Sequence, residues 1–165
     1  MGVAFIHPTA NVEAGVVLGE DTRVWAWSHV CQGAVIGDHC IIGEGVYIGP
    51  HVHIGHRCKI QNHSLIYEGV EIADEVFIGP NVVTTNDEFP RALGEWRQRF
   101  RATHIGRGAT VCANSTIVCG HTIGEHAFVG AGSVVTQDIK PGWIAFGNPA
   151  HHIRPVHPQP LEQPL

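Results

Sequence analysis

The chain has 165 residues, of which 44% are hydrophobic and 15% are charged, and its net charge is −5 at neutral pH. This composition predicts one folded domain and excludes a disordered chain or a coiled coil. The net negative charge offers no broad basic surface to a nucleic acid. The chain contains no apolar run of about 18 residues, so we expect no membrane span.

The N-terminal residues lack a basic region followed by an apolar run, so we expect no signal peptide. Five cysteines occur without a C-x-x-C pair. This odd number predicts reduced thiols in the cytoplasm and argues against structural zinc.

A six-residue repeat runs from Ile6 to Ile78, and its first residue is always Ile, Leu or Val. The fifth residue of each hexad is small or β-branched, from Ala10 to Val82. A period of six is a multiple of the two-residue period of a strand and not of the 3.6-residue helical period. Three hexads would close one coil, and like residues would stack in successive coils. One predicted column contains Ile6, Val24, Ile42, Ile60 and Ile78.

The repeat is predicted to break after Val83 and to resume at Ile105. Ile105 follows Ile78 by one and a half coil lengths, whereas the next residue of an uninterrupted column would follow it by one. We therefore expect an inserted loop of about residues 85–104 within a β-helical domain of residues 1–154. About seven coils are expected, starting near residues 6, 24, 42, 60, 78, 105 and 123. Four prolines among residues 155–165 predict a disordered tail.

The hexads and the C-terminal run, with GAGSVV at residues 130–135 and GNPA at residues 147–150, resemble the hexapeptide-repeat acyltransferase superfamily. This resemblance implies an all-β, left-handed parallel β-helix. It also implies a homotrimer with active sites between neighbouring prisms, and acetyl-CoA as the acyl donor.

A narrower resemblance rests on KIQNHSLIYEGVEI at residues 59–72, VFIGPNVVTTND at residues 76–87 and FPRA at residues 89–92. These segments are similar to the sugar-nucleotide 3-N-acetyltransferases, which acetylate a 3-amino group on UDP- or dTDP-linked sugars for surface polysaccharides. The resemblance implies the same reaction here. Acetyl transfer to a sugar hydroxyl is the alternative, and a trimeric β-helix without catalysis is a third possibility.

Asn86 and His121 are the predicted catalytic residues. The Asn of the matching Thr-Asn pair lies at the amine-binding site of the resembling enzymes, where its carbonyl oxygen would orient the amine. A turn-forming Asn is the alternative. His121 replaces a small residue at the fifth hexad position, and a histidine can accept the ammonium proton near neutral pH. In the alternative, the departing thiolate takes the proton and His121 lies in the core or the trimer interface.

The substrate pocket is assigned by the resemblance to Asn62, Tyr67 and Glu68, on the coil next to the loop. Half of the ten Lys and Arg residues lie in or just beyond the loop. Among them Arg91, in the matching Pro-Arg pair, is the preferred contact for a diphosphate, which arginine can bind through two hydrogen bonds. Ordinary surface polarity and a charge-balanced, solvated loop are the alternatives.

The acetyl-CoA site is placed by the resemblance in the C-terminal part of the chain. Lys140 and Arg154 would meet the phosphates, and Trp143 could stack on the adenine. Small residues and backbone N–H groups would receive the pantetheine arm, at Ala113, Asn114, Gly130, Ala131 and Ser133. Tight turns also require Gly and Ala, which is the alternative explanation.

Thirteen histidines raise the possibility of zinc, as in γ-class carbonic anhydrases, which share the fold class and carry a His-x4-His pair. His51 and His56, and also His121 and His126, have this spacing. They fall at other hexad positions than in those enzymes, so we expect no metal.

The five cysteines are expected to have no catalytic role. Cys40 and Cys58 are predicted to be small core residues. Cys31, Cys112 and Cys119 fall at outward hexad positions, where the sequence indicates no partner for a nucleophile.

Overall fold

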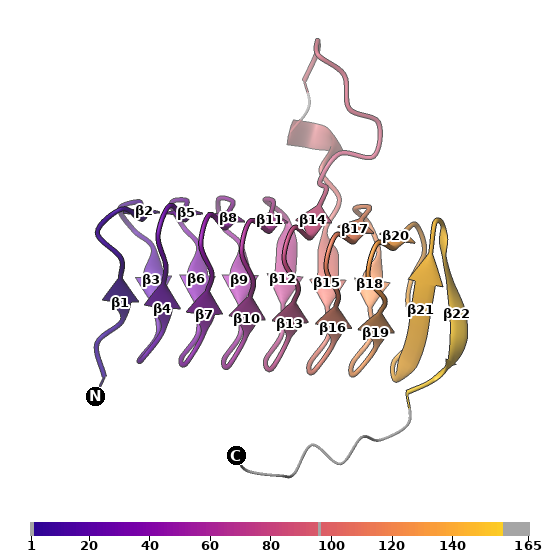
Figure 1. The fold of residues 1–165 in the computed structure, drawn as a ribbon. Coiled ribbons are helices and arrows are strands. Elements are labelled where there is room, and N and C mark those ends of the chain that lie inside the picture. The colour runs from indigo at the N-terminus through magenta and orange to yellow at the C-terminus, as the bar shows by residue number, and fades with distance from the viewer. Residues whose placement is uncertain (1, 96, 157–165) are drawn as a thin grey trace.

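The computed structural model describes residues 2–95 and 97–156. The chain forms a parallel β-helix, a three-sided prism in which short strands stack along one axis (Figure 1). No helix in the described part of the chain is long and apolar enough to cross a bilayer.

The three sides of the prism are three sheets, which we name faces A, B and C. Face A contains β1 (Phe5–Ile6), β4 (Arg23–Val24), β7 (Ile41–Ile42), β10 (Lys59–Ile60), β13 (Phe77–Ile78), β16 (Thr110–Val111), β19 (Phe128–Val129), β21 (Trp143–Gly147) and β22 (Ala150–Pro155). Face B contains β2 (Asn11–Val12), β5 (His29–Val30), β8 (Tyr47–Ile48), β11 (Leu65–Ile66), β14 (Val83–Thr84), β17 (Thr116–Ile117) and β20 (Val134–Val135). Face C contains β3 (Val17–Leu18), β6 (Val35–Ile36), β9 (His53–Ile54), β12 (Val70–Ile72), β15 (Thr103–Ile105) and β18 (Thr122–Ile123). We name the turns between faces the A–B, B–C and C–A edges.

The hexad pattern fills the interior of the prism as predicted. The column that begins at Ile6 is confirmed, since β1, β4, β7, β10 and β13 pair in parallel with like residues in register. From Val24 onward its members are fully buried, whereas Ile6 is 44% exposed because no coil lies before it. Stability therefore depends on stacking, because a single coil cannot bury its own apolar face.

The predicted register beyond the loop is wrong by one face. Ile105 pairs with Ile72, and Val111 rather than Ile105 continues the column of Ile78. Because Ile72 precedes Ile78 by one hexad, the insertion is one hexad longer than the sequence analysis expects. The last two coils consequently start on face A at residues 111 and 129 instead of 105 and 123.

Thr84 explains this error. It occupies the inward position of its hexad and is fully buried, so the repeat continues one residue past the predicted break at Val83. Its hydroxyl is satisfied, because it accepts the Tyr67 N–H at 2.9 Å and donates to the Leu65 carbonyl at 3.3 Å. A search for Ile, Leu and Val alone does not find such a residue.

The insertion forms an arm of residues 85–102 that projects from the B–C edge between β14 and β15, and the short 3₁₀ helix η1 (Arg97–Arg99) lies partway along it, on the segment that returns to the prism (Figure 1). The outgoing and returning segments of the arm are joined at its base. The Arg101 N–H donates to the Asn86 carbonyl at 3.0 Å, and Asp87 and Phe100 form an isolated antiparallel bridge. Thr103 and His104, expected within the loop, belong instead to β15.

The C-terminal end is closed by a hairpin. β21 continues face A in parallel with β19, and β22 returns antiparallel to it. β22 extends to Pro155, the first residue of the expected tail, and the Val156 N–H donates to the Gly142 carbonyl at 2.7 Å. Residues 157–165, the rest of that tail, lie outside the described residues.

Candidate active site

A cavity of about 540 Å³ lies at the foot of the arm, where the chain leaves face B. Four of the predicted site residues line it together, although they come from two different coils. They are Tyr67, Glu68, Asn86 and Arg91. Four residues that the narrower resemblance assigns to the active site therefore lie in one cavity.

Asn86 is held on the rigid stem of the arm, just after β14. Its carbonyl accepts the Arg101 N–H at 3.0 Å, and the neighbouring Thr85 hydroxyl accepts the Cys119 N–H of the next coil at 3.0 Å. Among the described residues, no hydrogen bond engages the Asn86 side-chain amide. Its side-chain oxygen is therefore free to accept a hydrogen bond from a ligand that enters the cavity.

One wall of the cavity is aromatic and apolar, formed by Tyr47, Tyr67 and Phe100 with prolines and an alanine. The Tyr47 and Tyr67 ring centroids are 5.4 Å apart with an interplanar angle of 51°. Burial and a hydrogen bond with Cys31 raise the pKa of Tyr47 to about 12. The Tyr47 hydroxyl therefore stays protonated at neutral pH and can donate a hydrogen bond but cannot act as a base.

Among the described residues that line the cavity, Arg91 is the only cation. Arg99 pairs with Asp87 at 3.1 Å, and Arg101 pairs with Glu88 at 3.0 Å. Arg91 is exposed and forms no ion pair within the described part of the chain, and its guanidinium donates to the preceding carbonyl at 2.9 Å. Its guanidinium is therefore available to an anionic ligand in the cavity.

Asn62 does not join this cavity. It lies at the A–B edge, where its side-chain oxygen accepts the Glu44 N–H at 3.1 Å and its carbonyl accepts the Asn81 N–H at 3.0 Å. These bonds link consecutive coils, so in this chain Asn62 stabilises the stack of turns. Its hexad position places Asn62 at the A–B edge, whereas Tyr67 lies at the B–C edge. The prediction of a shared pocket did not distinguish these two edges.

His121 lies at the B–C edge, one coil beyond the arm, and does not line the cavity within the chain. The Gly120 N–H donates to the Ala102 carbonyl at 3.1 Å, which places His121 at the base of the arm. Its ring is not enclosed in the core, since 27% of the side chain is exposed. Its Nδ1 lies 3.7 Å from Asp138 Oδ1. This distance is too long for a hydrogen bond, and among the described residues the Nε2 atom has no hydrogen-bond partner.

The residues assigned to the pantetheine arm gather at the A–B edge of the last two coils. The Gly132 N–H donates to the Ala113 carbonyl at 2.9 Å. The Ser133 hydroxyl donates to the Gly130 carbonyl at 2.5 Å and accepts the Gly147 N–H at 3.3 Å. Ser133 thus fixes the GNPA turn against the prism. Asn114 and Ala131 lie in the same two turns.

The residues assigned to the coenzyme's phosphates and adenine lie farther along the chain. Lys140 Nζ is 5.5 Å from the centroid of the Trp143 ring, and the His152 ring meets the same indole edge-on at 5.7 Å. Lys140 and Arg154 are exposed and make no ion pair among residues 2–95 and 97–156. Two unpaired cations beside a partly exposed indole fit a phosphate-bearing adenine nucleotide.

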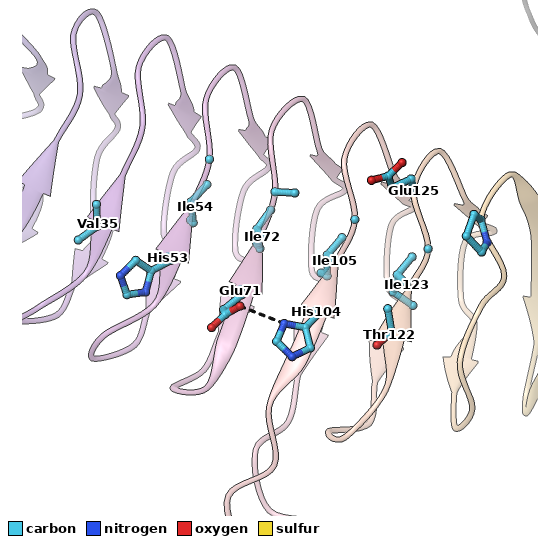
Figure 2. Close-up of a pocket in the computed structure, with 15 residues that line it drawn as sticks. Val35, His53, Ile54, Glu71, Ile72, His104, Ile105, Thr122, Ile123 and Glu125 are labelled. Carbon is cyan, nitrogen blue, oxygen red and sulfur yellow. Dashed lines mark ion pairs between the residues drawn. The ribbon is translucent and has the colours of Figure 1, made fainter.

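A groove of about 830 Å³ runs along face C and was not predicted from the sequence. Outward side chains of successive coils line it, and Glu71 and His104 form an ion pair at 3.0 Å (Figure 2). It ends at Pro141, beside Lys140. Glycine at position 106 is required there, since a Cβ would lie 2.7 Å from the Glu125 nitrogen. In the face C strands from β6 to β18, the residue before the inward aliphatic residue points outward and lines the groove. Comparing these outward residues from coil to coil could have revealed the groove from the sequence.

Sequence comparison decides the family. A family model described as bacterial transferase hexapeptide (six repeats) matches residues 15–50, 33–67 and 51–86. The chain is also 51% identical over 146 residues to the dTDP-3-amino-3,6-dideoxy-alpha-D-galactopyranose 3-N-acetyltransferase of Aneurinibacillus thermoaerophilus, covering 88% of this chain and 75% of that enzyme. The chain belongs to the hexapeptide-repeat transferase family.

Solved structures of sugar acetyltransferases share the fold of this hexapeptide-repeat protein. PerB from Caulobacter crescentus, solved with CoA and GDP-perosamine, aligns with a TM-score of 0.59 at 26% identity, over 92% of this chain and 57% of PerB. A galactoside acetyltransferase in complex with coenzyme A aligns with a TM-score of 0.66 at 29% identity, over 76% of this chain and 66% of that one. The predicted superfamily, its β-helical fold and the class of CoA-dependent acetyltransferase are thereby confirmed.

Proposed function

We propose that this hexapeptide-repeat protein transfers the acetyl group of acetyl-CoA to the 3-amine of a nucleotide-linked 3-amino sugar. The observation that carries the proposal is the cavity at the foot of the arm, which gathers Tyr67, Glu68, Asn86 and Arg91. The relative that is 51% identical is named for this reaction on a dTDP-linked 3-amino-3,6-dideoxy sugar. Synthesis of a surface polysaccharide is the proposed purpose.

The lining of the cavity favours a deoxy sugar over a uronic acid. Tyr47, Pro50 and Phe100 offer apolar surface to a methyl group and to the flat face of a base or sugar. The diphosphate would take the free guanidinium of Arg91. A sugar carboxylate would then lack a cation and would lie close to Glu68 and Asp87, which also line the cavity.

The chemistry requires a neutral amine that attacks the thioester carbonyl. Asn86, through its side-chain oxygen, would accept an N–H of the amine and direct its lone pair. As the new N–C bond forms and the C–S bond breaks, the nitrogen must lose a proton. His121 Nε2 would take this proton, with Asp138 stabilising the imidazolium, and would return it to the thiolate. No metal takes part in these reaction steps.

The proposed enzyme is a homotrimer. The cavity and His121 lie at the B–C edge, whereas the residues assigned to the coenzyme lie at the A–B edge and beyond Ile139. A neighbouring prism would bring such separate edges together. The outward aliphatic residues of face B, Leu65, Val83 and Val134, would supply apolar contact area. The five free cysteines support a cytoplasmic location.

The test is the release of free CoA thiol from acetyl-CoA with a panel of dTDP- and UDP-linked 3-amino sugars and their 3-hydroxyl counterparts. The proposal expects release with one 3-amino sugar and little release with the matching hydroxyl sugar. Release with hydroxyl acceptors alone would replace N-acetyl transfer with O-acetyl transfer. No release with any acceptor would contradict the proposal.

A further inference from the structure

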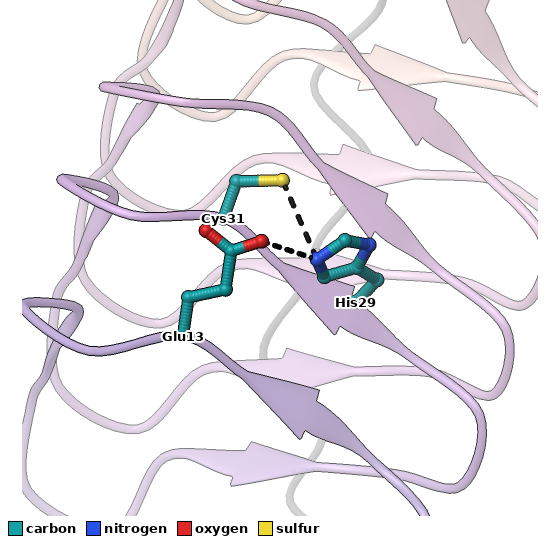
Figure 3. A group of neighbouring side chains, drawn as sticks. All are labelled: Glu13, His29 and Cys31. Carbon is teal, nitrogen blue, oxygen red and sulfur yellow. Dashed lines mark hydrogen bonds and ion pairs between the residues drawn. The ribbon is translucent and has the colours of Figure 1, made fainter.

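Three metal-ligating side chains meet at the B–C edge of the first two coils, on the N-terminal side of the arm. Glu13 Oε1 lies 2.7 Å from His29 Nε2, and Cys31 Sγ lies 3.7 Å from the same nitrogen (Figure 3). One ligand atom from each residue lies within 4.8 Å of the other two. Cys31 was expected at an outward position, but it is only 6% exposed and lies against His29.

The helical repeat itself brings these residues together. Glu13 and Cys31 are one full coil apart in the sequence and occupy the same position in successive coils, just after β2 and β5. His29 points outward from β5, at the strand position that precedes the inward Val30. The three residues therefore converge from two coils, and their contact could not be found from local spacing.

The geometry distinguishes a cation site from a nucleophilic triad. In a triad the thiol and the carboxylate bind opposite nitrogens of the imidazole, so that a proton passes through the ring. Here both approach the same nitrogen, Nε2, which can form only one hydrogen bond at a time. A cation placed among the three would instead be bound by all of them.

The distances suit zinc. Tetrahedral zinc with ordinary bond lengths separates a thiolate sulfur from an imidazole nitrogen by about 3.6 Å, and a carboxylate oxygen from that nitrogen by about 3.3 Å. The sulfur–nitrogen distance here is 3.7 Å, and the oxygen–nitrogen distance of 2.7 Å needs to open by only about half an ångström. Thiolate, imidazole and carboxylate together favour zinc over magnesium or calcium.

Neighbouring groups already orient two of the ligands. The second oxygen of Glu13, Oε2, accepts the Gln32 N–H at 2.7 Å, which fixes the carboxylate against the second coil. The Tyr47 ring meets the His29 imidazole edge-on, with their centroids 5.7 Å apart, which restricts the orientation of the imidazole. Such contacts to the ligands are typical of metal sites and hold their orientation.

We propose that Glu13, His29 and Cys31 bind one Zn²⁺ ion, with the fourth position open to water, and that this ion fastens the first coil to the second. The first coil is less tightly packed than the coils that follow it, since its inward Ile6 is 44% exposed, whereas Val24 and Ile42 of the same column are fully buried. Binding displaces the thiol proton of Cys31, which leaves to solvent. The site adjoins the cavity through Tyr47, whose ring meets the His29 ring at 5.7 Å, but it shares no ligand with the proposed reaction and would persist if that reaction proved wrong.

The test is titration of the full-length, metal-free protein with Co²⁺, which reports a thiolate ligand through a charge-transfer absorption band. The proposal expects one Co²⁺ per chain with this band, and Cys31→Ser abolishes the band and weakens binding at least about 100-fold. His29→Gln and Glu13→Gln weaken binding while leaving a thiol in place. Cys112→Ser and His104→Gln are matched controls, since His104 pairs with Glu71 at 3.0 Å without a thiol, and both bind Co²⁺ like the parent protein.

Thermal melting gives a second readout that does not depend on the band. Zn²⁺ at about 100 times its dissociation constant raises the Tm of the parent protein by about 5–10 °C, and it leaves the Tm of Cys31→Ser unchanged. Absence of the charge-transfer band in the parent protein overturns the proposal. An equal band or an equal Zn²⁺-induced Tm rise in Cys31→Ser overturns it as well.

Discussion

The regular coils and the arm-bearing B–C edge use the same repeat in opposite ways. In the regular coils, each inward residue stacks on a like residue and each turn bonds the next turn, so Ile42, Ile60 and Ile78 are interchangeable members of one column. At the arm, Tyr67 replaces a turn glycine, Thr84 replaces an aliphatic residue, and the inserted segment opens a cavity. Repetition stabilises this fold, and the departures from repetition create its candidate active site.

The largest effect expected from this comparison is on stability. Ile60→Ala removes a fully buried side chain from the middle of a column and should cost about 2–5 kcal/mol of unfolding free energy. Lys59→Ala, at the outward position of the same strand, should change it by less than about 0.5 kcal/mol. Urea unfolding of both variants measures the difference, and equal losses would show that the column does not bear the stability.

The next effect is on turnover. His121→Ala should lower kcat at least about 100-fold, because the proton acceptor is lost, while the affinity for acetyl-CoA and the Tm stay near those of the parent protein. Steady-state kinetics and calorimetric titration measure these quantities. An undiminished kcat would assign the proton transfer to the departing thiolate.

A smaller effect is expected for the phosphate contact. Arg91→Lys keeps the positive charge but loses the bidentate geometry, so KM for the nucleotide sugar should rise about 10-fold with little change in kcat. Arg101→Lys is the matched control, since Arg101 is already paired with Glu88 at 3.0 Å. Equal KM changes in the two variants would remove Arg91 from the substrate site.

The smallest effect concerns acid stability at the C–A edge. Glu75 contacts Arg107 at 3.0 Å and Arg57 at 2.8 Å, and these hydrogen bonds lower its pKa from 4.5 to about 2. A carboxyl whose pKa is lowered by folding stabilises the fold above its unfolded pKa, and this stabilisation is lost as the pH falls through the folded value. The Tm difference between the parent protein and Glu75→Gln should therefore be constant near neutral pH and shrink between pH 4.5 and about 2. A Tm difference that does not change with pH would contradict this role of the Glu75 carboxylate.

The sequence predicted the parts of the fold that repeat. The hexads determined the column from Ile6 to Ile78, because one inward residue per short strand is a local property. The register beyond the arm was missed because Thr84 is a polar residue in an apolar position, which its hydrogen bonds to the neighbouring coil allow.

The candidate site was predicted less completely, for a physical reason. Tyr67, Glu68, Asn86 and Arg91 were found through local motifs, and the cavity unites them. Asn62 was misplaced because neighbouring residues of a hexad can lie at different edges of the prism. The contact of Cys31 with His29 and Glu13 joins two coils, so it depends on side-chain directions that no single segment specifies.

The central claim is that the cavity beside the arm binds an amine and directs it to an acetyl thioester. The most direct measurement is kcat/KM for a dTDP-linked 3-amino-3,6-dideoxy sugar and for its 3-hydroxyl analogue, in the parent protein and in Asn86→Ala. We expect at least about 100-fold preference for the amine, and a loss of most of that preference in Asn86→Ala without a change in Tm. Equal use of the two acceptors, or an unchanged preference in Asn86→Ala, would contradict it.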